Sequence, residues 1–239
     1  MRIRFFTILS LLLSIIIFSC QKEIQPFDPS QPPIIDTTNN GGDTTSNDTS
    51  SVNSYQPLTT GSWWKYQDSA TGAISLNTVA SSTKTINGIL HNALIATSDI
   101  QTDTVWTAAP RPNYYLVVQG ASPNTGAAFD LTFHYLNDTA SVGYNWQYNA
   151  GSGGDFTAYI TTTIVAKNLT MTIGGKTYTN VIQTRLDLSY DIFGTLMDYG
   201  YYTYFTAQGV GILKIRAEIR NMGVPVMQTC SDLIDYSIQ

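Results

Sequence analysis

The feature that most constrains the fold of this chain is a two-residue alternation of apolar and polar side chains. It recurs in three stretches, at residues 156–161, 185–190 and 213–219. In the last of these, Leu, Ile and Ala alternate with Lys, Arg and Glu. Successive side chains of a β-strand point to opposite faces, so this pattern predicts strands with one buried face. Because no comparable helical period is present, we expect an all-β fold, a single curled antiparallel sheet or half-barrel.

Short turn sequences predict two tight hairpins. Residues 86–89 read Ile-Asn-Gly-Ile, and residues 173–176 read Ile-Gly-Gly-Lys. Both central pairs tolerate the positive φ angles that type I′ turns require.

Short motifs also occur twice, in the same order. They are G-x-x-W-x-Y at 61–66 and 143–148, T-x-T-I-x-G at 83–88 and 170–175, and a weaker match between 105–108 and 204–207. They predict two similar halves, residues 58–125 and 138–220, in which Trp64 and Trp146 occupy equivalent, buried places on one face. Chance similarity in a chain rich in Thr and aromatic residues is the alternative.

The N-terminus has the layout of a secretory signal peptide. Arg2 and Arg4 precede an apolar run from Phe5 to Phe18. This run is too short for a comfortable transmembrane helix, which needs about 20 apolar residues. Residues 1–19 are therefore interpreted as a cleaved signal peptide.

The end of this segment, Ile-Phe-Ser-Cys at 17–20, resembles the lipobox of bacterial lipoproteins. The resemblance implies cleavage before Cys20 and lipid attachment to it, so that the membrane is a partner through the N-terminal lipid. An ordinary signal peptide followed by a chance cysteine is the alternative. Gln21 stands where an inner-membrane retention signal has Asp, and Cys-Gln-Lys-Glu at 20–23 resembles the surface-export signal of Bacteroidota lipoproteins. The implied location is the outer membrane, at the cell surface or the periplasmic face.

Residues 20–54 are predicted to be the lipidated cysteine and a disordered linker, and residues 55–239 one antiparallel β domain. The linker is rich in Pro, Thr, Asn and Gly, so it has too little apolar surface to offset the entropy of ordering. Thr37 and Thr44 each follow Asp and precede Thr. This sequence resembles the O-glycosylation acceptor of Bacteroidota, which implies that these two threonines carry glycans.

Composition excludes several classes of function. The net charge is −5, and it becomes −7, with 10 basic and 17 acidic residues, once the two arginines of the signal peptide are removed. No basic stripe is present, so we expect no nucleic-acid partner. Cys230 has no disulfide partner if Cys20 is lipidated, and His91 and His134 form no metal-binding motif, so neither a metal nor a cofactor is expected.

The sequence contains no recognisable catalytic constellation. It has no nucleophile-elbow, zinc-protease or phosphate-loop motif. Asp130, Asp187 and Asp191 are candidates for the carboxylate pair of a glycosidase, but their spacing does not single them out. We therefore assign no catalytic residue and expect a non-enzymatic protein, with a glycan-active hydrolase as the less favoured alternative.

Aromatic residues supply the candidates for ligand binding. Trp63 and Trp64 are adjacent in a predicted strand, so they point to opposite faces. Tyr202 and Tyr204 share one face of another strand. We take Trp63, Tyr202 and Tyr204 as candidates for stacking on a ligand, and packing within the protein is the alternative for all three.

Residues 57–66 and 204–214 resemble corresponding segments of uncharacterised Bacteroidota lipoproteins. The resemblance implies an envelope lipoprotein with a β-rich domain and no established activity. We expect a monomer whose β domain binds an apolar molecule, a glycan or an envelope protein, and a structural or accessory role is the alternative. An apolar cleft in the concave face of the sheet would favour a lipid ligand, an exposed aromatic row a glycan, and a filled concave face an accessory role.

Overall fold

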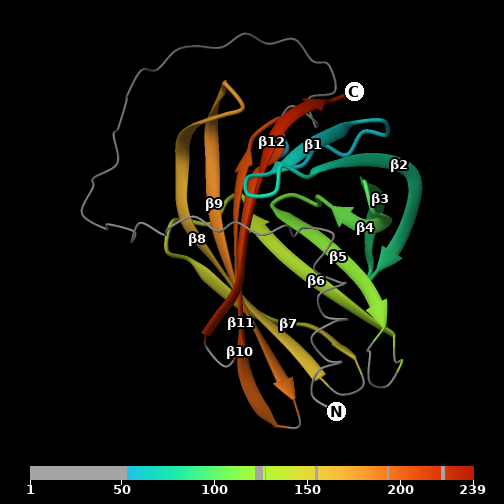
Figure 1. Cartoon of the computed structure of the whole chain (residues 1–239), viewed down its shortest axis with the longest axis vertical. Helices are drawn as coiled ribbons and strands as arrows, with labels where there is room; N and C mark the ends of the chain where they lie inside the picture. The colour runs from blue at the N-terminus through green and yellow to red at the C-terminus, as the bar shows by residue number, and fades with distance from the viewer. Residues whose placement is uncertain (1–52, 122–125, 127, 154–155, 193, 222–223) are drawn as a thin grey trace.

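The computed structural model describes residues 53–121, 126, 128–153, 156–192, 194–221 and 224–239, none of which is helical. Twelve strands form one antiparallel sheet (Figure 1). The strands are β1 (Trp63–Asp68), β2 (Ile74–Ile86), β3 (Ile89–Ser98), β4 (Thr102–Ala108), β5 (Asn113–Ala121), β6 (Ala128–Asn137), β7 (Asn145–Gly153), β8 (Phe156–Ile173), β9 (Lys176–Ile192), β10 (Thr195–Ala207), β11 (Gly211–Asn221) and β12 (Val224–Ser237). The predicted all-β fold with a single curled antiparallel sheet is confirmed.

The order of the strands across the sheet is β6-β5-β4-β3-β2-β1-β12-β11-β10-β9-β8-β7. Neighbouring strands are consecutive along the chain except β1 and β12, whose pairing joins the first strand to the last. Strand twist and the β-bulges in several pairs curl the sheet. The curl brings the two edge strands, β6 and β7, into contact, and we call this contact the seam. The sheet is therefore nearly closed into a barrel.

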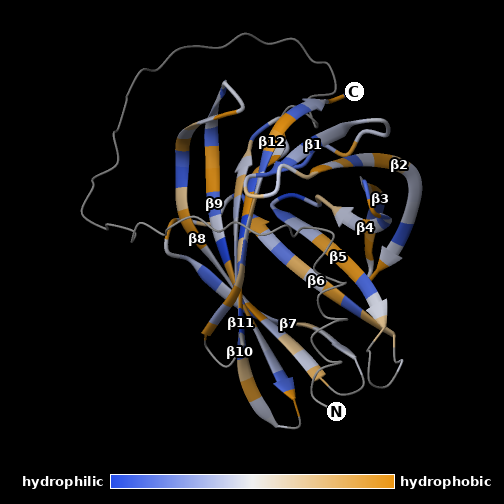
Figure 2. Cartoon of the chain, in the orientation of Figure 1, coloured by the Kyte–Doolittle hydropathy of each residue, from blue (hydrophilic) through white to orange (hydrophobic). Residues whose placement is uncertain are grey.

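Side-chain alternation explains which face of each strand is buried. Figure 2 shows apolar and polar residues alternating along β5 and β6. In the first half of β8 the buried positions are every second residue, Ala158, Ile160, Thr162 and Ile164. These side chains point to the concave face of the sheet, where the hydrophobic core lies.

The strand order divides the sheet into two six-stranded meanders, β1–β6 and β7–β12. The repeated motifs fall at the same positions in the two meanders. The first motif is at β1 and β7, the second at the β2–β3 and β8–β9 hairpins, and the third on β4 and β10. Both predicted hairpins form, with φ angles of 50° and 78° at Asn87 and Gly88 and of 57° and 76° at Gly174 and Gly175. The arrangement agrees with the prediction of two similar halves.

Trp64 and Trp146 lie on the same face of the sheet, as predicted. Trp146 lies opposite Thr162, Thr162 opposite Leu186, and Leu186 opposite Tyr202, all on the concave side. The expected burial of the indole is correct for Trp64, which is 1% exposed, and wrong for Trp146, which is only partly buried. The reason is that Trp146 lies on the edge strand β7, beyond which no further strand is paired among the described residues.

Large side chains from opposite walls fill the concave face. Tyr202 and Tyr204 of β10 meet Phe133 and Tyr135 of β6, with ring centroids 5.7 Å and 5.4 Å apart. All four side chains are buried. Because a buried aromatic ring removes roughly 150–250 Å² from water, this contact between the walls stabilises the curl of the sheet.

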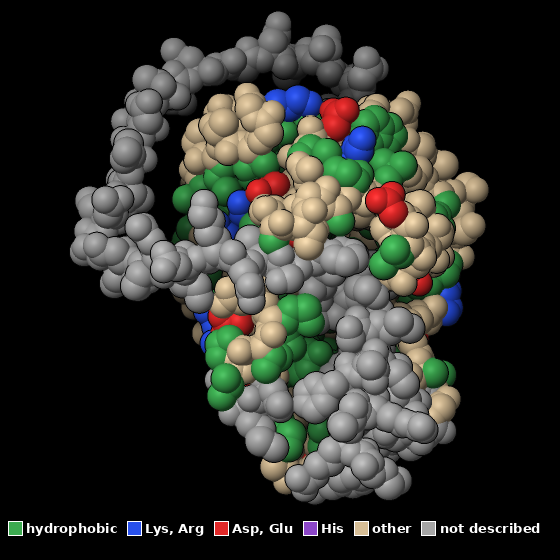
Figure 3. Space-filling model, viewed as in Figure 1, with side chains coloured by type: hydrophobic (Ala, Val, Ile, Leu, Met, Phe, Trp, Pro, Cys, Tyr) green, Lys and Arg blue, Asp and Glu red, His purple; other side chains and the backbone are tan. Residues whose placement is uncertain are grey.

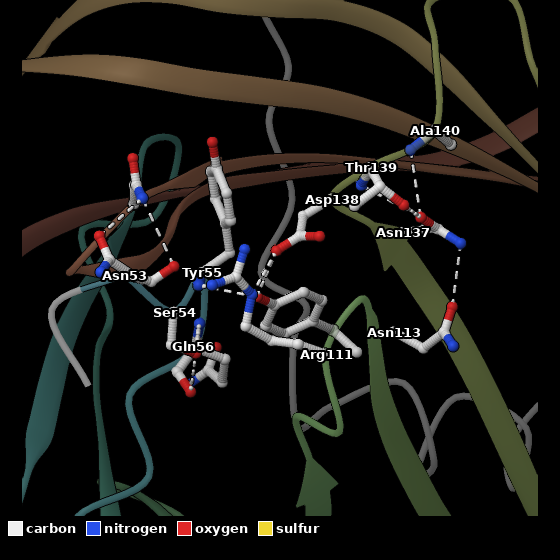
Figure 4. A network of polar contacts seen from close by, with 12 residues as sticks. Asn53, Ser54, Tyr55, Gln56, Arg111, Asn113, Asn137, Asp138, Thr139 and Ala140 are labelled. Atoms are coloured by element: carbon white, nitrogen blue, oxygen red, sulfur yellow. Dashed lines mark hydrogen bonds and ion pairs between the residues drawn. The ribbon is translucent and has the colours of Figure 1, made fainter. Parts of the chain in front are cut away.

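The segment before β1 covers one end of the curled sheet. Residues 54–57 are buried, and the carbonyl oxygen of Ser54 accepts a 2.8 Å hydrogen bond from the backbone N–H of Gly209. Figure 4 shows this segment next to a buried polar network. The segment is therefore part of the folded domain.

The network centres on Asp138, in the connection between β6 and β7. Its Oδ2 accepts hydrogen bonds of 2.9 Å from both Arg111 Nε and the Tyr114 hydroxyl. The Tyr114 hydroxyl accepts a bond of 3.2 Å from the backbone N–H of Tyr55. Burial raises the pKa of Tyr114 to about 12, so the hydroxyl stays protonated at neutral pH. The network therefore ties the N-terminal segment to β5 and to the β6–β7 connection.

Candidate functional site

The seam is closed by side-chain hydrogen bonds instead of strand pairing. The backbone N–H of His134 donates to the Tyr148 hydroxyl at 2.7 Å, and the Thr162 hydroxyl donates to the His134 carbonyl at 3.0 Å. Tyr148 and Thr162 belong to the concave faces of β7 and β8. The free edge of β6 therefore lies against the concave-face side chains of both β7 and β8. The two edges of the sheet thus overlap, with β6 inside β7.

Glycine at position 151 permits this close approach. A Cβ atom at Gly151 would overlap the carbonyl oxygen of Asp130 on β6, and the residue has a φ angle of 144°. Ala150, beside it, is 2% exposed. The backbones of β6 and β7 thus touch at this point without a side chain between them.

Four aromatic side chains form a row across the seam, which we call the seam row. Tyr115 of β5 stacks on His134 of β6 with centroids 4.5 Å apart, and His134 lies 4.9 Å from Trp146 of β7. Tyr144, just before β7, lies 5.9 Å from Trp146 and is 53% exposed. The other three rings are partly exposed. The row therefore presents aromatic surface to solvent where the two edges of the sheet meet.

A groove of about 680 Å³ opens beside the seam row. This volume lies within the range typical of ligand sites, roughly 300–1,000 Å³. The lining residues come from β5, β6, β7 and the β2–β3 turn, and are Asn87, Tyr115, Ala128, Phe129, Asp130, Thr132, His134, Trp146, Tyr148, Asn149, Ala150, Gly151 and Ser152. Aromatic rings and small polar groups thus line the same groove.

The groove carries little charge. Among its described lining residues Asp130 is the single carboxylate, and none is Lys or Arg. Burial lowers the pKa of His134 to about 4, so its imidazole is neutral near pH 7. His134 Nε2 lies 3.1 Å from the Asn113 side-chain oxygen, an acceptor, which places the proton on Nε2.

A second cavity lies inside the curled sheet and is much smaller. Trp64, Tyr66, Leu94 and Val105 are among its lining residues, and its volume is about 100 Å³. A water molecule occupies about 30 Å³ of liquid, so the cavity has room for only a few waters. It is too small for a lipid chain, because the core side chains already occupy the concave face.

The residues predicted from sequence to stack on a ligand do not come together. Trp63 is half-buried on the convex face of β1, opposite Thr78 and Ser237. Tyr202 and Tyr204 are 3% and 1% exposed on the concave face, where they pack in the core. Neither tyrosine offers a ring face to solvent, so both are packing residues of the core. Trp63 remains a candidate for stacking on a ligand at the surface.

Three other predicted sites, Cys20, Thr37 and Thr44, lie outside the described residues.

Sequence reasoning did not select the residues of the seam row as a site. The repeated G-x-x-W-x-Y motif marked Trp146 and Tyr148, but as core residues. His134 was considered only as a metal ligand, for which the sequence contains no motif. Alternation places His134 on the opposite face of its strand from Phe133 and Tyr135, and the burial of these two residues shows that the His134 face is the outer one.

The carboxylates considered for hydrolysis are not gathered in the groove. Asp130 lines it, whereas Asp187 and Asp191 of β9 are not among the lining residues. Asp187 pairs with Arg185 at 2.8 Å. In the described part of the chain no group of three or more His, Cys, Asp or Glu side chains is placed to hold a metal ion.

The described residues include no helix long and apolar enough to span a membrane.

No protein-family model and no curated protein matches this chain. Two solved structures do, a proposed exported protein with a YmcC-like fold from Bacteroides fragilis and a proposed lipoprotein from Parabacteroides distasonis. Each is 10% identical in sequence, with a TM-score of 0.46, and the alignment covers 77% of this chain and 99% of the other. The two neighbours are thus an exported protein and a lipoprotein by their descriptions.

Proposed function

We propose that this chain is a non-enzymatic, lipid-anchored protein of the bacterial outer membrane whose groove at the seam binds a glycan. In this proposal the anchor is Cys20, and the protein acts as a monomer at the cell surface or the periplasmic face. The support for the anchor is the lipobox-like sequence at 17–20.

Detergent phase partitioning tests the anchor. The unaltered protein should enter the detergent phase, and Cys20→Ala should remain in the aqueous phase because it lacks acyl chains. Equal partitioning of the two would remove the anchor from the proposal.

The observation that carries the glycan proposal is that Tyr115, His134 and Trp146 of the seam row line a groove of about 680 Å³. A pyranose ring has an apolar face of C–H groups, which packs on aromatic rings, and hydroxyls around its edge, which need donors and acceptors. Trp146 and Tyr115 supply aromatic surface, and Asn87, Asn149 and Ser152 supply polar groups. Apolar surface with a few polar groups is the usual composition of a small-molecule site.

Other classes of ligand are less well supported. A lipid carrier needs an apolar cleft, but the cavity inside the curled sheet measures only about 100 Å³. A nucleic-acid partner needs clustered cations, but Figure 3 shows Lys and Arg scattered over the face it displays. A glycosidase needs a pair of carboxylates across its cleft, and the described lining of the groove contributes only Asp130.

Two tryptophan variants test where a glycan binds. Trp146→Leu should weaken the binding of neutral oligosaccharides, measured by calorimetry, by about tenfold or more, because a tryptophan at the centre of a site is commonly a dominant contact. Trp63→Leu is the matched control, since Trp63 is also half-buried but lies on the convex face of β1. Thermal unfolding of both variants would show that the fold is kept.

The opposite result would relocate or remove the site. If Trp63→Leu weakens binding and Trp146→Leu does not, the ligand binds on β1 and the groove is not the site. If no oligosaccharide in a broad panel binds the unaltered protein, the glycan proposal is contradicted.

A further inference from the structure

The charged groups around the groove are few, and each makes a hydrogen bond to a neighbouring side chain. Asp130 Oδ1 accepts a 2.6 Å hydrogen bond from Gln119 Nε2. The oxygen of the same amide accepts bonds from Trp106 Nε1 at 2.9 Å and from Lys84 Nζ at 3.1 Å. The Lys84 ammonium also lies 5.6 Å from the centre of the Trp106 ring. The exposed lysine thus contacts Gln119 and Trp106 and is not a lining residue of the groove, whose one charged lining residue among those described is Asp130.

The other polar groups of the groove are uncharged. The Asn149 side-chain oxygen accepts a 2.9 Å bond from the Gly151 N–H, and this bond does not use the N–H groups of the Asn149 amide. Asn87, at the tip of the β2–β3 hairpin, and Ser152 are exposed and neutral. His134 adds no positive charge, because burial keeps its pKa near 4. The described lining thus offers amides, hydroxyls and one carboxylate, and no cation.

We propose that the groove selects neutral saccharides and rejects acidic ones, with Asp130 as the residue that determines this selectivity. This inference rests on the proposed glycan-binding function. A sugar carboxylate in the groove would meet a like charge and find no cation to compensate the loss of its hydration. The hydroxyls of a neutral sugar can bond to the Asp130 carboxylate, and hydrogen bonds to a charged acceptor are the stronger kind.

Matched pairs of oligosaccharides test the inference. Manno- and galacto-oligosaccharides are compared with mannuronic and galacturonic acid oligomers of the same length and linkage, by calorimetry at low ionic strength. The neutral member of each pair should bind about tenfold more tightly, and added salt should reduce the difference because it screens the repulsion at Asp130, which is exposed. Asp130→Asn, which keeps an acceptor oxygen for Gln119, should bring the ratio of the two affinities to within about threefold.

The control variant is Asp187→Asn, which removes an exposed carboxylate on β9, outside the groove lining, and should leave the affinity ratio as it is in the unaltered protein. Acidic oligomers that bind the unaltered protein as tightly as their neutral partners would overturn the inference, and so would an unchanged ratio in Asp130→Asn. These results differ from a failure of the proposed function, in which neither member of any pair binds or Trp146→Leu has no effect.

Discussion

At the scale of single residues, Gly151 is the position on which the seam depends most directly. Gly151→Ala would place a methyl group on the Asp130 carbonyl oxygen, at a backbone φ angle of 144° that residues with a side chain rarely adopt. Relief of the overlap requires β6 to move away from β7. We expect a loss of about 2–4 kcal/mol in the free energy of unfolding, measured by chemical denaturation.

Gly88→Ala separates the overlap from the backbone effect. Gly88 has a φ angle of 78°, but a Cβ atom there would have no neighbour within 4 Å. Its expected cost is that of the left-handed conformation alone, about 1–2 kcal/mol. If Gly151→Ala costs no more than Gly88→Ala, β6 and β7 are not in close contact in solution.

At the scale of elements, the segment before β1 behaves as part of the domain. Tyr55 is 8% exposed and Gln56 is 5% exposed, and Tyr55 joins the network of Asp138 through Tyr114. A chain that begins at Leu58 should lose about 2–4 kcal/mol through the lost packing and hydrogen bonds. The melting temperature should fall by about 2–4 °C for each kcal/mol.

The matched control is a chain that begins at Asn53, which should melt at the same temperature as one that begins at Gln21. A lower melting temperature for the Asn53 chain would show that residues 21–52 stabilise the domain. Equal melting of the chains that begin at Asn53 and Leu58 would show that residues 54–57 contribute nothing to its stability.

At the scale of the whole molecule, local features were predictable and the closure of the sheet was not. The hairpins at 86–89 and 173–176 are specified by adjacent residues, so the sequence predicts them correctly. Alternation also shows that Tyr202 and Tyr204 share a face. It does not show which face becomes concave, because the curl is a collective property of twelve strands. These two tyrosines, which were candidates for stacking on a ligand with packing as the alternative, are in the core.

The candidate site depends on the same closure. Tyr115 and His134 lie in the first half of the chain and Trp146 in the second, and only the contact of β6 with β7 places them in one row. In the described residues β6 and β7 are not joined by the regular backbone hydrogen bonds of paired strands. Side-chain hydrogen bonds bridge the seam instead. A sequence pattern therefore cannot predict that β6 and β7 lie in contact. The partial exposure of Trp146, in contrast, is explained by the position of β7 at the edge of the sheet.

The four indole N–H groups of this protein provide the most direct test of the central claim, that a ligand binds at the seam and not inside the sheet or on β1. Each tryptophan gives one indole signal in a ¹H–¹⁵N NMR spectrum, and the probe is the neutral oligosaccharide that binds most tightly by calorimetry. We predict that the Trp146 signal shifts on titration, while the signals of Trp63 and of Trp64, whose Nε1 donates to the Val210 carbonyl at 2.6 Å, stay in place. A shift of the Trp63 or Trp64 signal with an unchanged Trp146 signal would contradict the claim.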